Sequence, residues 1–452
     1  MNPHIFREYD IRGLVEKDLT EEVAKQIGQA AGTYLRKYGN KIVVGKDNRK
    51  SSHLLANALI EGLLSTGCDV IDIGTFPTPV LYFSIHLYSQ TGGVMLTGSH
   101  NPPEYNGFKI CEGLSSLYGE EIQKLRRIIE SKNFEKGEGK LFRKNPKQDY
   151  VNFISKKVEI NPDLKIVIDA GNGTSGFLIP ELMEKLNLNP SCLYMEPDGN
   201  FPNHLPDPTV VENMQDLIAK VKQLKADIGI GYDGDADRIG AIDDRGRIVW
   251  GDKLLCLYAK DMLSRHPHSK VIMDVKCSQA TIEYIEKYGG KPIMWKTGHS
   301  LIKEKMKKEG ALLAGEMSGH MFFKDNYLGF DDAFFASLRL LEILSKTKEK
   351  FSQLVDEIPN YYSTPEIRID CPEQEKFKVV ENFKKYFKKK YKTIDIDGVR
   401  ILFENGWGLV RASNTQPILV LRFEAKTEQG LQEIKNEIKK KLSEYPFIAA
   451  EI

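Results

Sequence analysis

Residues 93–103 read Gly-Val-Met-Leu-Thr-Gly-Ser-His-Asn-Pro-Pro and join an apolar run to a polar turn. The apolar residues predict the end of a buried strand, and two consecutive prolines prevent the chain from continuing as helix or sheet. The hydroxyl of Ser99 is therefore held on a stiff turn at a strand end. Gly98 lets other groups approach the backbone closely, and His100 places an imidazole beside the hydroxyl. This arrangement is typical of a reactive serine, and a capped surface loop is the alternative.

Strand and helix patterns alternate around this turn and recur in two further units. The first unit contains an apolar strand at 41–44, a helix that begins at Ser51 or Ser52, and a strand at 70–73. A polar segment at 132–148 is expected to be a connection. In each unit a polar loop follows a buried strand, and in open α/β sheets ligands gather at such strand ends. The other strands are expected at 165–169, 226–231, 271–275, 292–295 and 311–315, and the other helices at 177–186, from 253, and at 331–344.

The last part of the chain has an α+β pattern. A strand at 365–369 precedes a helix at 373–389, whose phenylalanines, Phe377 among them, are expected to face inward. Two hairpin turns follow, at Asp397-Gly398 and Asn405-Gly406, before a final amphipathic helix. A chain of 452 residues exceeds what one hydrophobic core usually holds. This length indicates three or four domains, and the patterns along the chain favour four, three α/β and a smaller α+β one, over residues 1–149, 150–250, 251–364 and 365–452.

The composition is that of an ordinary soluble globular protein, with 41% hydrophobic and 28% charged residues. The net charge of +1 leaves no basic excess for a long nucleic-acid track or a membrane surface. No stretch approaches the roughly 20 apolar residues of a membrane span, and the amino terminus has no signal-like apolar run. The six cysteines are scattered singly, which indicates reduced thiols. We therefore expect a cytoplasmic protein that binds neither nucleic acid nor membrane.

Asp233, Asp235 and Asp237 follow the strand predicted at 226–231. In a tight extended loop, residues two apart can converge on one point, and three carboxylates there fit Mg²⁺. Without a cation they would repel one another strongly. An EF-hand is excluded because its sixth position would be Arg238 instead of glycine, whereas a metal-free capped turn stays an alternative. The guanidinium of Arg238 offers a fork to a phosphoryl oxygen near the metal.

Two later loops carry polar groups that suit a sugar phosphate. Residues 411–415 bring a guanidinium, two hydroxyls and an amide to a predicted hairpin loop, a set that matches a phosphate dianion. Residues 315–320 place Glu316, Ser318 and His320 at strand spacing on one side, where they could hydrogen-bond a polyol. A polar hairpin loop and a polar edge strand are the respective alternatives.

Five stretches together resemble the α-D-phosphohexomutase superfamily, and most closely its bacterial phosphomannomutase/phosphoglucomutase group. They are Phe6–Gly13, Thr97–Pro103, Asp233–Arg238, Gly315–His320 and Arg411–Thr415, in the order of that family and spread over essentially the whole chain. The resemblance implies a heart-shaped enzyme with mixed sheets in its three related α/β domains and a mobile carboxy-terminal domain. It also implies interconversion of hexose 1-phosphates and hexose 6-phosphates, of mannose, glucose or both, through a phosphoserine.

The resemblance further assigns roles to residues of this chain. One Mg²⁺ per chain would be held by Asp233, Asp235, Asp237 and Ser99, and hexose 1,6-bisphosphate would serve as bound intermediate and activator. The implied catalytic residues are Ser99, His100, Lys109, Arg238, Arg12 and His299. The implied substrate-binding residues are Tyr9, Lys276, Glu316, Ser318, His320, Arg411, Ser413, Asn414 and Thr415.

Three positions refine the resemblance. Ala236 stands where many relatives have glycine, and its methyl group is tolerable if the backbone there has a negative φ. Met317 and Asn414 favour the glucose and mannose branch over the glucosamine branch. A phosphoglucosamine mutase and a non-catalytic regulator that binds sugar phosphates stay as alternatives. Hexose phosphates are the expected partners of a monomer or homodimer, and the general base is open among Lys109, His100 and His299.

Overall fold

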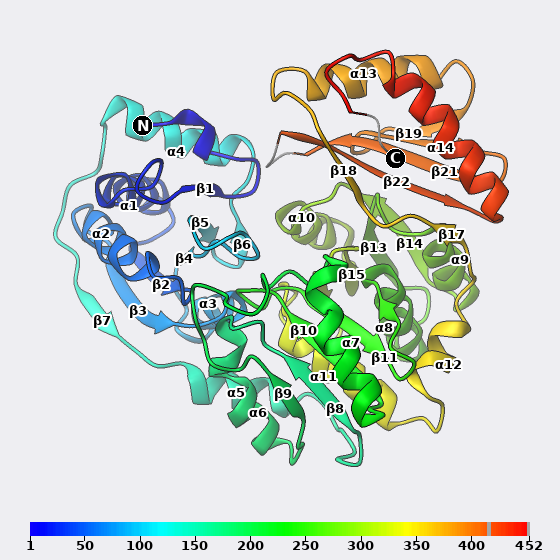
Figure 1. The fold of residues 1–452 in the computed structure, drawn as a ribbon. Helices are drawn as coiled ribbons and strands as arrows, with labels where there is room; N and C mark the ends of the chain where they lie inside the picture. The colour runs from blue at the N-terminus through cyan, green and yellow to red at the C-terminus, as the bar shows by residue number, and fades with distance from the viewer. Residues whose placement is uncertain (414–416, 450–452) are drawn as a thin grey trace.

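The computed structural model describes residues 1–413 and 417–449. Its strands form four separate sheets, and we call the parts built around them domains I to IV. Figure 1 shows domain I in blue and cyan on one side, domains II and III in green and yellow below and beside it, and domain IV in orange and red above them. The four parts outline a heart, and the predicted class of three α/β domains and one α+β domain is confirmed.

Domain I is built on a mixed sheet in the order β1-β5-β4-β2-β3-β7, with β6 paired to β5. Strands β2, β3, β4 and β7 run parallel, whereas β5 is antiparallel to β4 and β1. The elements are η1 (Pro3–Ile5), β1 (Ile11–Leu14), α1 (Glu21–Leu35), β2 (Lys41–Lys46), α2 (Ser52–Leu64), β3 (Asp69–Thr75), α3 (Thr78–Leu87), β4 (Gly92–Leu96), β5 (Tyr105–Glu112), β6 (Ser115–Ser116), α4 (Glu120–Ser131) and β7 (Leu141–Arg143). Strand β7 lies inside the segment expected to be a plain connection, and no apolar alternation marks it because all three of its residues are exposed.

Domains II and III repeat the plan with smaller sheets, in the orders β12-β11-β10-β8-β9 and β14-β13-β15-β16. One apolar core continues from α3 through both of them. In chain order the elements of domain II are α5 (Lys147–Ser155), β8 (Ile166–Asp169), η2 (Thr174–Phe177), α6 (Ile179–Lys185), β9 (Ser191–Leu193), η3 (Val211–Met214), α7 (Gln215–Leu224), β10 (Ile228–Tyr232), β11 (Ile239–Asp243) and β12 (Ile248–Val249). Those of domain III are α8 (Gly251–Arg265), β13 (Lys270–Asp274), α9 (Gln279–Lys287), β14 (Lys291–Trp295), α10 (His299–Glu309), β15 (Leu313–Gly315), β16 (Met321–Phe323), α11 (Ala333–Ser345) and α12 (Phe351–Asp356).

Domain IV has an antiparallel sheet in the order β17-β22-β21-β20-β19, with β18 also paired to β22, and a core of its own. Phe377 does not face inward as expected: its exposed fraction is 55%, because the buried stripe of α13 passes through Val379, Phe383 and Phe387. The elements are β17 (Tyr362–Ser363), β18 (Ile367–Asp370), α13 (Lys376–Phe387), β19 (Lys392–Ile394), β20 (Val399–Phe403), β21 (Gly406–Ala412), β22 (Ile418–Ala425) and α14 (Glu428–Leu442).

Two buried arginines dock domain IV on domain III. Arg400 donates to the backbone carbonyls of Val275 and Cys277, and Arg422 donates to the carbonyl of Lys276 and to Asp252. Three consecutive carbonyls after β13 are thereby fixed by the sheet of domain IV. Among the described residues, no helix is long and apolar enough to cross a membrane.

Candidate active site

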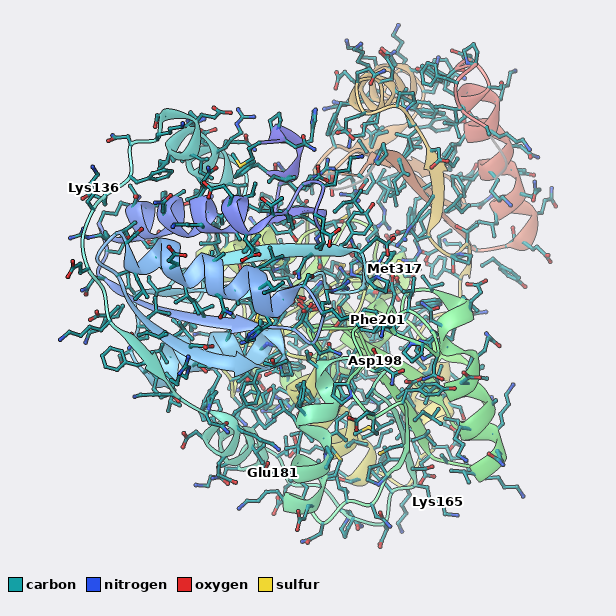
Figure 2. The ribbon with its side chains drawn as sticks, turned by 60° about the vertical axis from the view of Figure 1, so that its left-hand side comes forward. Lys136, Lys165, Glu181, Asp198, Phe201 and Met317 are labelled. Atoms are coloured by element: carbon teal, nitrogen blue, oxygen red, sulfur yellow. The ribbon has the colours of Figure 1, made fainter. Side chains whose placement is uncertain are left out.

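A cavity of about 480 Å³ lies where the four domains meet. Loops from each domain line it, and Met317, near the middle of the molecule in Figure 2, is one of the lining residues. Of the residues singled out in the sequence, those that line it are Tyr9, Arg12, Ser99, His100, Lys109, Asp237, Arg238, Lys276, His299, Glu316, Ser318, His320, Arg411 and Ser413. Asn414 and Thr415 lie outside the described residues.

Ser99 sits on a strained turn just beyond β4. Its φ is +50°, a left-handed conformation that costs a non-glycine residue roughly 1 kcal/mol or more and is kept only where the surroundings enforce it. The backbone N–H of Ser99 donates to Oγ1 of Thr97 over 2.8 Å. Its hydroxyl donates to Oδ2 of Asp233 over 3.0 Å and lies 3.1 Å from Nδ1 of His100. The turn thus aims one buried hydroxyl at the aspartate loop of domain II.

The three aspartates after β10 converge as the spacing predicts. Asp233, Asp235 and Asp237 are fully buried, and each contributes a carboxylate oxygen to a group whose members lie within 4.8 Å of one another. Oδ1 of Asp233 accepts the N–H groups of Asp237 and Arg238, which closes the loop tightly. The condition of a negative φ at Ala236 is not met: its φ is +55°, because the tight reversal needs a left-handed residue there.

The charge of this aspartate loop is only partly balanced. Nζ of Lys109 donates to Oδ2 of Asp235 over 2.8 Å and to Oδ2 of Asp237 over 2.5 Å. Oδ1 of each of these two aspartates has no hydrogen-bond partner within the described part of the chain. Burial, together with the charges of Asp237 and Asp235, raises the pKa of Asp233 well above its usual value. Unpaired carboxylate oxygens at one buried point fit a hard divalent cation such as Mg²⁺.

The basic side chains of the cavity differ in charge. Burial opposes the charge of Lys109, yet Asp235 and Asp237 overcome it and raise the pKa of its ammonium above the ordinary value. Burial, reinforced by Arg238 and Arg12, lowers the pKa of His100 well below its ordinary value. Lys109 is therefore a fixed cation, and His100 is neutral.

His299 is also neutral. Burial lowers the pKa of His299 well below its ordinary value, although Asp331 opposes this shift. A neutral imidazole has a free lone pair that can accept a proton, which a charged ammonium lacks.

The loop from Gly315 to His320 is a turn, which corrects the expected strand spacing of its polar side chains and excludes the alternative of an edge strand. The N–H of Glu316 donates to the carbonyl of His320, and the N–H of Gly319 donates back to that of Glu316, so the side chains are not at strand spacing. Both ends of the turn still face the cavity. Oε1 of Glu316 accepts the N–H of Gly298 over 2.5 Å, and Nε2 of His320 accepts from Nε of Arg238 over 3.0 Å.

Domain IV and the residues at and just before β1 also line the cavity. The guanidinium of Arg411 is oriented by Asp397, with Nε and Nη2 at 3.1 and 3.0 Å from Oδ2. Tyr9 donates its hydroxyl to the carbonyl of Thr297 over 2.7 Å. Nη1 of Arg12 donates to Oδ1 of Asn101 over 3.2 Å, which ties Arg12 to the serine turn. Lysine and arginine groups therefore face the cavity from several directions.

Three residues of the cavity region escaped the sequence interpretation. Asp331, fully buried, has Oδ2 at 3.2 Å from Nδ1 of His320 and 3.5 Å from Nδ1 of His299. Glu366 and Arg368 line the cavity from the segment that enters domain IV, and Glu366 accepts from Nζ of Lys276 over 2.9 Å. The one signal in the sequence was that Asp331 is a polar residue among apolar neighbours. No sequence pattern marked Glu366 or Arg368.

Comparisons with known proteins cover nearly all of the chain. Phosphoglucomutase/phosphomannomutase family models match in four pieces: alpha/beta/alpha domain I at residues 3–136, domain II at 148–246, domain III at 250–362 and the C-terminal domain at 366–441. A phosphomannomutase/phosphoglucomutase of Pseudomonas aeruginosa is 48% identical over 97% of this chain and 95% of its own length. A phosphoglucomutase of Neisseria gonorrhoeae is 44% identical over 98% of each chain. A crystal structure of a phosphoglucomutase/phosphomannomutase family protein from Burkholderia thailandensis, 41% identical, superposes with a TM-score of 0.92 over 98% of this chain and 97% of that one.

Proposed function

This chain belongs to the phosphoglucomutase/phosphomannomutase family, and from this premise we propose the reaction that it catalyses and the residues that carry it. It is a phosphohexomutase, an isomerase that interconverts hexose 1-phosphates and hexose 6-phosphates. We take glucose and mannose phosphates as its substrates. We propose that it works in the cytoplasm as a monomer or homodimer.

The observation that carries the mechanism is the position of Ser99. Its hydroxyl lies 3.0 Å from Asp233 at one wall of the cavity, whereas Arg411 lines another wall from domain IV. We assign Ser99 as the carrier of the phosphoryl group and the Arg411 loop as the holder of the substrate's second phosphate. A reactive end and a gripping end in one cavity are what transfer within a bisphosphate requires.

In the forward step the bond between phosphorus and Oγ of phosphorylated Ser99 breaks, and a new bond forms from phosphorus to a free hydroxyl of the hexose monophosphate. The hydroxyl loses its proton to a base, Oγ of Ser99 takes up a proton as it leaves phosphorus, and the product is a bound hexose 1,6-bisphosphate. After this intermediate turns round, Oγ of Ser99 gives up that proton and attacks the phosphorus of the other phosphoryl group. The bond from that phosphorus to the sugar oxygen breaks, and the sugar oxygen regains a proton. Such transfer depends on positioning and charge neutralisation, because its transition state is loose and its charge lies on the equatorial oxygens.

We propose that Asp233, Asp235 and Asp237, with an oxygen of Ser99, hold one Mg²⁺ per chain. The unpaired Oδ1 atoms of Asp235 and Asp237 support this assignment. When bound, such an ion supplies positive charge for the phosphoryl oxygens. Lys109, whose ammonium already touches two of the aspartates, adds a fixed positive charge at the same wall, and Arg238 adds another.

The proton of the attacking hydroxyl goes to a neutral histidine in our scheme. Two carboxylates raise the pKa of the Lys109 ammonium, which disfavours Lys109 as the acceptor among the candidates left open by the sequence. His100 and His299 line the cavity and are neutral, so they are the proposed acceptors.

We propose that the turn from Gly315 to His320 recognises the sugar through Glu316, Ser318 and His320. Lys276 and Tyr9 line the cavity beside this turn. Glucose and mannose differ only at C2, so a site that reads the other hydroxyls accepts both. We propose Arg411 and Ser413, followed by Asn414 and Thr415, as the grip on the distal phosphate.

Side-by-side turnover of glucose 1-phosphate, mannose 1-phosphate and glucosamine 1-phosphate tests the proposal. We expect fast conversion of the first two and slow conversion of the third. Preference for glucosamine 1-phosphate would support a phosphoglucosamine mutase instead. Binding without turnover of any of the three would support a regulator that binds sugar phosphates.

A further inference from the structure

Arg49, just beyond β2, is folded behind the turn that carries Ser99. Its side chain is fully buried, with an exposed fraction of 0%. A guanidinium has five N–H donors, and all five are used here. The acceptors are the carbonyls of Ser99 and Asn101 (from Nη2 over 2.8 and 2.6 Å), those of Pro102 and Tyr105 (from Nη1 over 2.6 and 3.0 Å), and Oδ2 of Asp47 (from Nε over 3.1 Å).

One side chain therefore gathers four carbonyls of a single turn. Buried carbonyls without partners would each cost about 1–3 kcal/mol, so these bonds hold together a backbone that would not keep its shape alone. The conformation that they enforce includes the positive φ of Ser99. Gly98 allows the contact, since a Cβ there would lie 2.5 Å from Cζ of Arg49. The close approach expected at Gly98 is thus confirmed, with Arg49 as the approaching group.

Asp47 completes the support. Its Oδ2 accepts the N–H of Gly98 over 3.0 Å as well as Nε of Arg49, and its Oδ1 accepts the hydroxyl of Ser52 at the start of α2. Burial lowers the pKa of Arg49, and the charge of Asp47 opposes that shift. The guanidinium is thus anchored to the first turn of a helix and to the turn that it supports.

The same segment also contacts domain II. The guanidinium of Arg49 lies 5.1 Å from the ring centre of Phe201, which Figure 2 labels near the middle of the molecule. Nδ2 of Asn48 donates to the carbonyl of Asn172 over 2.8 Å. The carbonyl of Ser99, one of the four acceptors, packs on Gly234 in the aspartate loop, where a Cβ would lie only 2.4 Å from it. The segment of Asn48 and Arg49 that holds the Ser99 turn therefore also fixes the position of this turn relative to the aspartate loop.

We propose that Arg49 is a positioning residue for the phosphoryl transfer: it sets Oγ of Ser99 against the aspartate loop without contacting the substrate. This inference rests on the proposed role of Ser99 as phosphoryl carrier. Its physical basis is that a displacement of about 1 Å at reacting atoms can cost about a hundredfold in rate.

The test compares Arg49→Met and Arg49→Lys with a matched control, Arg339→Met. Arg339 is equally buried and paired with carboxylates, but it lies on α11 and its partners are Asp325 and Asp261. For each purified full-length variant we would measure kcat and KM for glucose 1-phosphate, and hydrogen exchange in peptides covering residues 98–105 and α1.

We expect Arg49→Met to lower kcat about a hundredfold while KM changes by less than about threefold, because the contact does not bind substrate. Amides of residues 98–105 should exchange faster, whereas those of α1 should not change. Arg49→Lys should recover part of kcat, since an ammonium has three donors for the five acceptors. Arg339→Met should keep the kcat of the folded protein within about twofold, because neither Arg339 nor its partners Asp325 and Asp261 line the cavity.

Three results would overturn the inference: kcat of Arg49→Met within about twofold of the parent, unchanged exchange in 98–105, or an equal kcat loss in Arg339→Met. If Arg49→Met is insoluble, Arg49→Lys decides by the same criteria. If the parent enzyme shows no mutase activity, the proposed function fails, while the exchange measurement still decides whether Arg49 holds the turn.

Discussion

Truncating Arg411 tests whether domain IV grips the phosphate that is not reacting. Asp397 orients the guanidinium through two contacts of 3.1 and 3.0 Å, so the fork is preorganised before substrate arrives. A charge-assisted hydrogen bond to a dianion contributes about 1.5–3 kcal/mol. Contacts to a non-reacting phosphate are similar in the ground and transition states, so their loss raises KM more than it lowers kcat. Arg411→Ala should therefore raise KM about ten- to a hundredfold.

The assay is the initial rate of hexose 6-phosphate formation from glucose 1-phosphate and from mannose 1-phosphate, for Arg411→Ala beside the parent. Arg411→Lys should restore only part of the affinity, because an ammonium cannot reproduce the planar two-point contact. Asp397→Asn keeps the guanidinium but weakens its orientation, so its KM should lie between those of the parent and Arg411→Ala. The reasoning is refuted if both KM values of Arg411→Ala stay within about twofold of the parent and kcat is unchanged, a change of only about 0.4 kcal/mol.

Three further predictions concern single side chains. Asp235→Asn should lower kcat by about 10²- to 10³-fold with little change in the unfolding midpoint, and chelation should inhibit the parent; activity indifferent to chelator contradicts the metal assignment. Burial lowers the pKa of His204, but its 3.1 Å contact with Asp169 outweighs burial and raises this pKa overall. Protonated His204 therefore stabilises the fold at low pH, and this contribution is lost as the pH rises through the raised pKa. His204→Gln should thus cost about 1.5 kcal/mol at about pH 6 and less at about pH 8 in urea titrations, and a pH-independent cost would be contrary evidence. Ala236→Gly should raise the free energy of unfolding by about 1 kcal/mol because φ at this residue is +55°. A decrease in the free energy of unfolding, measured by urea titration, would contradict strain at this residue.

The parts of the site that follow buried strands could be predicted from the sequence, because a strand end and a polar turn are both local patterns. Ser99 and the three aspartates belong to this class: the hydroxyl of Ser99 reaches Asp233 over 3.0 Å, and oxygens of the three carboxylates lie within 4.8 Å of one another. Carboxylates two residues apart can converge on one point only if the chain turns tightly. The spacing of the three aspartates was therefore enough to predict both the tight turn and the cluster.

Features that depend on contacts distant in sequence could not be predicted. Asp331 faces two histidines only because α11 begins beside the turn that ends at His320, and no local spacing encodes that meeting. The polar side chains of the same turn were expected at strand spacing because alternate polar residues fit an extended segment; two backbone hydrogen bonds close a turn there instead. The outward position of Phe377 shows that a helix with many apolar residues does not reveal which stripe its sheet will bury.

The central claim is that the transferred phosphoryl group resides on Ser99. The most direct measurement is intact mass with peptide mapping after the enzyme has been incubated with glucose 1,6-bisphosphate and freed of it, repeated after a chase with excess glucose 1-phosphate. We predict one phosphate on the peptide that contains Ser99. If the bisphosphate carries heavy oxygen in its phosphoryl groups, this phosphate should keep its occupancy during the chase but lose its label to hexose phosphate, because each turnover returns a phosphoryl group to Oγ of Ser99. Ser99→Ala should show neither the phosphate nor mutase activity. An active parent enzyme that carries no phosphate at Ser99, or a Ser99→Ala variant that keeps most of the activity, would contradict the claim.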